Sequence, residues 1–128
     1  MADAPKAGEF CWNELATGNV ETAKNFYGKL FGWEFQEHQM PDMTYTMAKA
    51  NNKDVAGFWA IPKEQQKQMS PHWLSYILVE DVEESVKKAA SLGASIVKPV
   101  SRAGDFGSFA VIRDPVGAHI ALWQPAQR

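Results

Sequence analysis

The stretch Asn19-Val-Glu-Thr-Ala-Lys-Asn-Phe-Tyr-Gly-Lys-Leu-Phe-Gly-Trp33 determines how the first half of the chain is interpreted. Asn19 is a favoured N-cap residue, and the glutamate that follows lies in the first turn, where the helix dipole favours a negative charge. Gly32 suits the left-handed position that ends a helix. The stretch therefore predicts one amphipathic helix, because apolar residues recur at helical spacing at Val20, Ala23, Phe26, Tyr27 and Leu30.

Strand-like stretches lie on both sides of this helix. One precedes it and three follow it, and each is rich in aromatic or β-branched residues. The sequence Asn51-Asn-Lys53 is a hairpin signal between the last two stretches. The first half thus reads as strand, helix and three strands, with the strands at Phe10–Leu15, Trp33–His38, Thr44–Ala50 and Val55–Ile61.

The second half repeats this order. Asp81 is a second candidate N-cap, 62 residues after the first, and Gly93 follows Gly32 by 61 residues. The strands of this half are expected at Trp73–Val79, Ser95–Val97, Ser108–Arg113 and Ala118–Trp123. A repeat of this length indicates duplication of a supersecondary unit. We therefore expect an α+β fold in one domain, residues 1–128, with βαβββ modules at 8–61 and 72–125 and a polar linker at 62–71.

The turn Asp114-Pro-Val-Gly117 connects the last two expected strands. Arg113 directly precedes it, and we expect an ion pair between Arg113 and Asp114.

Composition narrows the classes of function. The 128 residues carry a net charge of −2, and Lys and Arg form no basic run, which argues against nucleic-acid binding. Apolar runs are far shorter than the roughly 20 residues of a membrane span, and no secretory signal is seen, so we expect a cytoplasmic protein without membrane partners. The single Cys11 excludes an internal disulfide, and it reads either as a small buried hydrophobe or as a catalytic thiol.

Six short motifs occur in order along the chain, namely Trp12-Asn-Glu-Leu15, Phe26-Tyr27, Leu30-Phe-Gly-Trp33, Val79-Glu-Asp-Val82, Gly93-Ala94 and Asp114-Pro-Val-Gly-Ala118. Together they resemble the vicinal oxygen chelate superfamily, which includes glyoxalase I, bleomycin-resistance proteins, fosfomycin-resistance enzymes and extradiol dioxygenases. The resemblance covers about residues 8 to 125, and it implies paired βαβββ modules that curl into a cup, with sites formed in a homodimer. Five tryptophans suit either an aromatic-lined cavity or a plain core.

The same resemblance implies a divalent metal held by about four His, Glu or Gln ligands, one on the first and last strand of each module. The four positions fall on Trp12, on Gly57 or Trp59, on Leu74 and on Ala121. None of these side chains is a usual metal ligand. We therefore expect no metal cofactor at these positions.

Three polar residues lie two positions away from these sites and on the same strand faces, namely Glu14, His72 and His119. We expect them to serve as polar contacts for a ligand in a metal-free cavity, and a displaced metal site is one alternative. In a second alternative, Glu14 and His119 are catalytic and move a proton on a bound substrate without a metal.

Two classes of function remain, and whether the protein is an enzyme stays open. The first is a small-molecule binding protein related to bleomycin-resistance proteins, without the metal site. The alternative is a glyoxalase I-like lyase or isomerase, or a dioxygenase-related enzyme, with displaced ligands or metal-free acid–base chemistry. A third possibility is a dimeric accessory protein that binds no ligand. We expect a homodimer whose ligand contacts Trp12, Trp59, His72, Leu74, Tyr76, Ala121 and Trp123.

Overall fold

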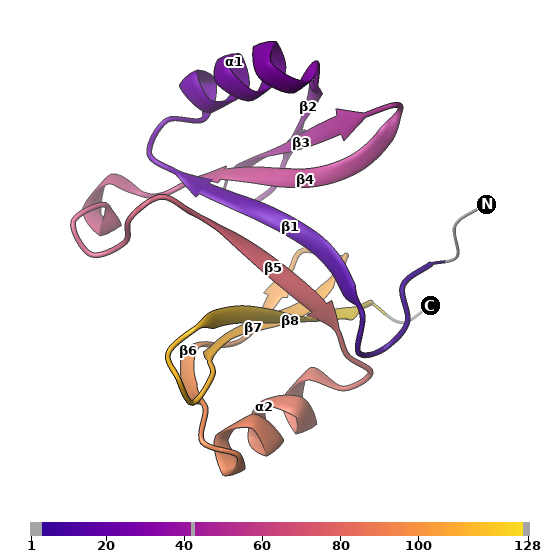
Figure 1. Cartoon of the computed structure of the whole chain (residues 1–128), viewed down its shortest axis with the longest axis vertical. Helices are drawn as coiled ribbons and strands as arrows, with labels where there is room; N and C mark the ends of the chain where they lie inside the picture. Colours follow the sequence, from indigo (N-terminus) through magenta and orange to yellow (C-terminus); the bar gives the residue numbers. More distant parts are fainter. Residues whose placement is uncertain (1–3, 42, 127–128) are drawn as a thin grey trace. The chain divides into compact units, whose positions relative to one another are not determined.

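The computed structural model of the chain describes residues 4–41 and 43–126. These residues form eight strands and two α-helices (Figure 1). No helix in this part of the chain is both long and apolar enough to cross a membrane. The first half contains β1 (Phe10–Thr17), α1 (Val20–Phe31), β2 (Glu34–Gln39), β3 (Thr44–Ala50) and β4 (Lys53–Ala60). The second half contains the 3₁₀ turn η1 (Lys63–Gln65), β5 (His72–Leu78), α2 (Val82–Ser91), β6 (Ser95–Ala103), β7 (Gly107–Arg113) and β8 (His119–Pro125). The expected α+β class with two βαβββ modules is confirmed.

The chain divides into two compact units. One is Asn13–Leu74, which we call the α1 unit, and the other joins Met1–Trp12 to Ser75–Arg128, which we call the α2 unit. The division runs through β1 and through β5, so each unit contains part of both strands. Each unit is described by itself below.

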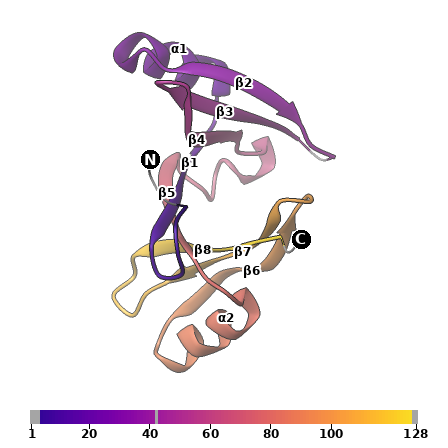
Figure 2. The same cartoon turned by 90° about the vertical axis from the view of Figure 1, so that its right-hand side faces the viewer.

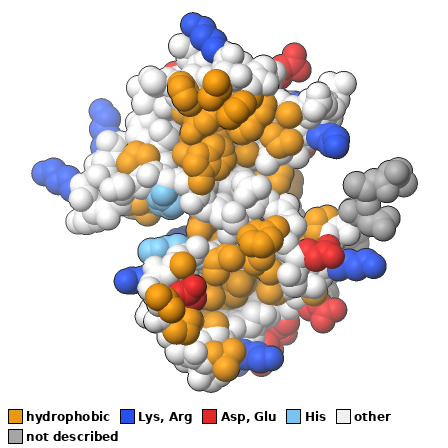
Figure 3. All heavy atoms as spheres, in the orientation of Figure 1, with side chains coloured by type: hydrophobic (Ala, Val, Ile, Leu, Met, Phe, Trp, Pro, Cys, Tyr) orange, Lys and Arg blue, Asp and Glu red, His pale blue; other side chains and the backbone are white. Residues whose placement is uncertain are grey.

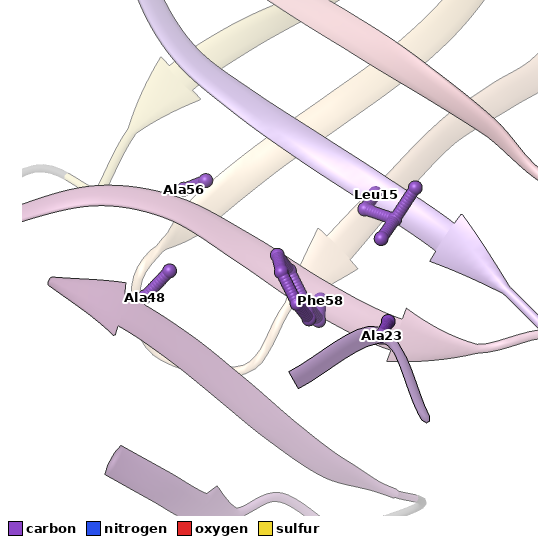
Figure 4. Close-up of a cluster of buried hydrophobic side chains, with 5 residues drawn as sticks. All are labelled: Leu15, Ala23, Ala48, Ala56 and Phe58. Atoms are coloured by element: carbon purple, nitrogen blue, oxygen red, sulfur yellow. The ribbon is translucent and has the colours of Figure 1, made fainter. Parts of the chain in front are cut away.

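The α1 unit has the strand order β2-β3-β4-β1, in which β1 is parallel to β4 and the other pairs are antiparallel. Alternate residues of these strands face α1 and bury a small apolar cluster against it. Phe58 is fully buried, and Ala23 brings the helix onto the cluster (Figure 4). This packing fixes which face of the sheet each strand residue occupies. The cluster consists of Leu15, Ala23, Ala48, Ala56 and Phe58.

The ends of α1 follow the expected local signals. The Asn19 side chain accepts a hydrogen bond from the Thr22 backbone N–H at 3.0 Å, and Gly32 ends the helix with a φ of 74°. Asn51 and Asn52 both have positive φ, as a tight hairpin between β3 and β4 requires. These three expectations are confirmed.

The α2 unit has the order β5-β8-β7-β6, and β5 is parallel to β8. Figure 2 shows α2 beside one face of β6, β7 and β8. Asp81 accepts a hydrogen bond from the Glu84 backbone N–H at 3.1 Å and caps α2 as expected. The buried cluster beneath this helix consists of Val82, Ala110, Ile112 and Leu122.

Strand β6 is longer than expected. The sequence predicts a strand only over Ser95–Val97, whereas β6 continues to Ala103 and passes through Pro99. Proline lacks the N–H group needed for a central strand, but β6 is at the sheet edge and pairs only with β7. The register shifts twice, between Ile96 and Lys98 and between Lys98 and Ser101, which accommodates the proline.

The expected ion pair between Arg113 and Asp114 is wrong. Within the described residues no ion pair joins them. Instead, Asp114 Oδ1 accepts hydrogen bonds from the backbone N–H groups of Val116 at 2.9 Å and Ala118 at 3.0 Å. An Asp side chain in a turn bonds readily to nearby main-chain groups, and this local interaction replaces the salt bridge.

Two of the five tryptophans pack on the α1 side of their sheet. The Trp73 indole N–H donates to the Tyr27 hydroxyl at 3.1 Å, and the two ring centroids are 5.5 Å apart. Trp33 stacks on the same tyrosine at 5.7 Å. This cluster reaches the surface, where Phe26 is 56% exposed and Trp73 41% exposed, and Figure 3 shows hydrophobic side chains gathered over this part of the molecule. Trp33 is half-buried and Trp73 is exposed, so both pack on the α1 side without being buried core residues.

Candidate functional site

The α1 unit presents a second sheet face, on the side away from its helix. Leu15 and Phe58 face the helix, so their strand neighbours point the opposite way. The parallel pairing of β1 with β4 places Glu14 beside Gly57 and Ala16 beside Trp59. We call this surface the helix-free face of the α1 unit.

A hydrogen-bonded pair of polar side chains lies on this face. The Tyr45 hydroxyl donates to Glu14 Oε2 at 2.9 Å, and the pair is partly buried. The Tyr45 ring crosses Gly57, since a Cβ atom added to Gly57 would overlap the hydroxyl and the ring. Tyr45 was not among the site residues expected from sequence. Strand alternation is the signal that could have found it. Thr46 is buried on the helix side of β3, so the neighbouring Tyr45 faces the opposite side.

The α2 unit also has a helix-free face, and this face is more apolar. The register places Ala121 beside Tyr76 and Val111, and Trp123 beside Phe109. Tyr76 and Ala121 are buried, and the Tyr76 and Phe109 rings are 6.5 Å apart. The structure therefore brings together three expected contact residues, Tyr76, Ala121 and Trp123.

The other expected residues are dispersed. Trp12 and Leu74 are half-buried on β1 and β5, and the division between the units runs beside both. His72 is exposed, with Nδ1 2.7 Å from the Ser70 carbonyl oxygen. His119 is exposed at the start of β8, where it pairs with Arg113 of β7. Of the three polar candidates, only Glu14 is partly buried.

The residues at the four implied ligand positions do not fit a metal ion. Trp12, Leu74 and Ala121 carry no suitable donor, and the space beside Gly57 is filled by the Tyr45 side chain. Across residues 4–41 and 43–126, no group of three or more His, Cys, Asp and Glu side chains could hold a metal ion.

Cys11 is half-buried on β1, and its burial raises the pKa of the thiol. A raised pKa lowers the fraction of thiolate, which is the nucleophilic form. This environment favours a packing role for Cys11 over a catalytic one.

Comparison with known proteins identifies the class to which the chain belongs. Residues 10–122 match the model of the Glyoxalase/Bleomycin resistance protein/Dioxygenase superfamily, and the chain belongs to this family.

Particular relatives extend this assignment. The protein named "Putative glyoxylase CFP32" of Mycobacterium tuberculosis is 36% identical over 115 residues, which cover 88% of this chain and 44% of that protein. The chain spans about half the length of the curated relatives it matches. Among solved structures, methylmalonyl-CoA epimerase from M. tuberculosis has a TM-score of 0.70 at 16% identity, covering 99% of this chain and 94% of that one. The Mn(II)-bound glyoxalase from Novosphingobium aromaticivorans has a TM-score of 0.59 at 11% identity, covering 96% and 42%. These two likenesses show the fold, and the second shows that the fold also occurs with a bound metal.

Proposed function

We propose that the chain binds a small organic molecule against the helix-free face of the α1 unit and does so without the usual metal site. The Glu14–Tyr45 hydrogen bond is the observation that carries the proposal. Small-molecule sites combine a mainly apolar surface with a few placed polar groups, and a partly buried carboxylate–phenol pair beside a tryptophan has this character. The implied ligand positions support it as well, because Trp12, Leu74 and Ala121 carry no metal-binding donor.

The aromatic residues supply the apolar contact area. Trp59 is half-buried next to the Glu14–Tyr45 pair. The helix-free face of the α2 unit, taken by itself, carries the aromatic residues Tyr76, Phe109 and Trp123. Large aromatic side chains bury extensive area at low cost in conformational entropy, which suits the binding of flat organic molecules.

A thermal-melt screen with a panel of aromatic compounds tests this proposal. A compound that binds only the folded protein, at about 100 times its Kd, stabilises the protein by about 2.7 kcal/mol. We expect at least one compound to raise the Tm and Trp59→Ala to abolish the rise. Trp73→Phe is the matched control, because Trp73 packs on the α1 side of the sheet. A panel in which no compound raises the Tm contradicts the proposal.

A second candidate is a glyoxalase I-like lyase or isomerase, or a dioxygenase-related enzyme. It is favoured by the partly buried Glu14 carboxylate, a type of side chain that can act as a general base, and by the name of the mycobacterial relative. In this alternative Glu14 and His119 act on the substrate, either directly or through a displaced metal site.

Divalent ions distinguish the two candidates. Metal-stripped protein is melted with Ni²⁺, Zn²⁺, Mn²⁺, Fe²⁺, Co²⁺ or Mg²⁺ in turn. The metal-free binding proposal expects the same Tm with each ion. A rise with one ion that is lost in His119→Ala supports the displaced metal site, and a glyoxalase assay of Glu14→Gln then tests the acid–base role.

We also propose that the chain forms a homodimer and acts in the cytoplasm. Its curated relatives are about twice as long, so a second copy would supply a comparable length of chain. A single cysteine with a raised pKa suits a reducing compartment, in which it stays a thiol.

A further inference from the structure

Helix α1 exposes three large apolar side chains. Phe26 is 56% exposed, and Leu30 and Phe31 are each 57% exposed. The ring of the half-buried Tyr27 connects them, with its centroid 4.9 Å from that of Phe26 and 6.1 Å from that of Phe31. The same ring is 5.5 Å from Trp73, whose exposed indole extends this surface onto β5. We call Phe26, Leu30, Phe31 and Trp73 the α1 patch, and all four belong to the α1 unit.

The second helix of the chain shows that the fold does not require this exposure. α2 is the helix of the other βαβββ module, and none of the exposed residues among Val82–Ser91, all of which the structure describes, is a large apolar one. Counted from the two N-caps, Lys88 occupies the position in α2 that Phe26 occupies in α1. A surface helix normally keeps its outer face polar, and a contiguous exposed apolar patch marks a site of interaction. The α1 patch therefore indicates a surface that another molecule covers.

The size of the α1 patch fits the centre of a protein–protein interface. Its four side chains are each about half exposed, which leaves on the order of 400 Å² of apolar surface on one copy of the chain. A stable interface covers about 800 Å² on each partner, and somewhat more than half of that area is apolar. The patch alone thus supplies most of the apolar area that a stable dimer needs.

The composition of the α1 patch suits an identical partner. In a two-fold symmetric interface the same residues meet from both copies, so a patch that is charged would repel itself. None of the four patch residues is charged, and Lys29 borders them on the helix, where its long side chain can reach solvent. A pair of chains also has about the same amount of polypeptide as one of the longer curated relatives.

We propose that the α1 patch is the surface through which two copies of this chain associate, with α1 of one copy packed against α1 of the other about a two-fold axis. This inference rests on the homodimer proposed above and specifies its interface.

Light scattering of the full chain tests the interface. The double variant Phe26→Lys, Leu30→Lys places two charges in the patch at positions that already face solvent. At a concentration where the wild type has about twice the 14.3 kDa of one chain, this variant should have the mass of one chain. Leu92→Lys is the matched control, because Leu92 is 67% exposed at the end of α2, and it should keep the wild-type mass. A double variant that stays dimeric, or a control that dissociates equally, would overturn the inference.

Cross-linking keeps the patch intact and so does not depend on the folding of the double variant. In a Cys11→Ser background, Lys29→Cys places the only thiol at the border of the patch. A short bismaleimide should join two copies of this variant and should leave Lys88→Cys, on α2, as a single chain. Failure of Lys29→Cys to cross-link, or equal cross-linking through Lys88→Cys, contradicts the interface.

The outcomes separate this inference from the proposals above. If the wild type has the mass of one chain at every concentration, the homodimer fails and the inference fails with it. If the wild type and the double variant are both dimeric, the inference fails and the homodimer stands. Ligand binding is measured independently, by the rise in Tm that depends on Trp59.

Discussion

At the scale of the residue, Asp114 illustrates how local chemistry can replace an expected ion pair. Its carboxylate accepts backbone hydrogen bonds from Ala118 and Val116, and these bonds lower the pKa of Asp114 below the usual value of an aspartate. Partial desolvation opposes this effect but is smaller. The ionised form is therefore favoured in the folded protein relative to the unfolded chain.

The sign of this shift gives a pH-dependent prediction. A carboxyl group whose folded pKa is depressed stabilises the fold above its unfolded pKa, and this contribution is lost as the pH falls through the folded pKa. Asp114→Asn should therefore lower the free energy of unfolding most at neutral pH, and the difference from wild type should shrink below about pH 4. Urea unfolding at pH 7, 5, 4 and 3 measures it, with Asp105→Asn in the β6–β7 turn as control. A difference that is constant with pH would contradict the prediction.

Glu14 and Tyr45 show how far single positions of the site can be predicted. The face of Glu14 follows from strand alternation alone. Its partner is 31 residues away in the chain, so no local pattern connects the two. The hydrogen bond between them forms across β4, which lies between β1 and β3 in the strand order of the sheet.

At the scale of the element, the sequence predicts a helix N-cap when the capping residue directly precedes the helix. Asn19 and Asp81 immediately precede their helices and bond within three residues. A third capping interaction comes from a distant strand, because Gln124 Oε1 of β8 accepts a hydrogen bond from the Val82 backbone N–H at 2.8 Å. Nothing in the sequence near α2 indicates this bond.

The Gln124 interaction yields a testable energy. The Val82 N–H is one of the first donors of α2, which have no partner within the helix, and its hydrogen bond to Gln124 is partly buried. Gln124→Ala should destabilise the protein by about 1 kcal/mol. Gln124→Glu keeps an acceptor and places a negative charge at the helix N-terminus, so it should retain stability. Chemical denaturation measures both, and equal loss in the two variants would argue against the cap.

At the scale of the whole molecule, the duplicated pattern was the strongest signal in the sequence. Two helices with similar N-caps and glycine ends, about 60 residues apart, predicted two βαβββ modules, and the structure has them. The compact units are not the same as the modules, since Phe10–Trp12 groups with the second half and His72–Leu74 with the first. This exchange of strand ends arises from long-range pairing, which alternation and turn signals do not report.

The relation to longer relatives gives the last prediction. The chain covers 44% of the mycobacterial protein and 94% of the epimerase chain. If a second copy takes the place of the additional length in the relatives, light scattering after size exclusion should give about twice the 14.3 kDa of one chain. Dilution should convert a weak dimer to monomer and should leave an obligate dimer intact, so the measurement is made at several concentrations. A mass of one chain at every concentration would contradict the homodimer and would leave the ligand-binding proposal to be tested on the monomer.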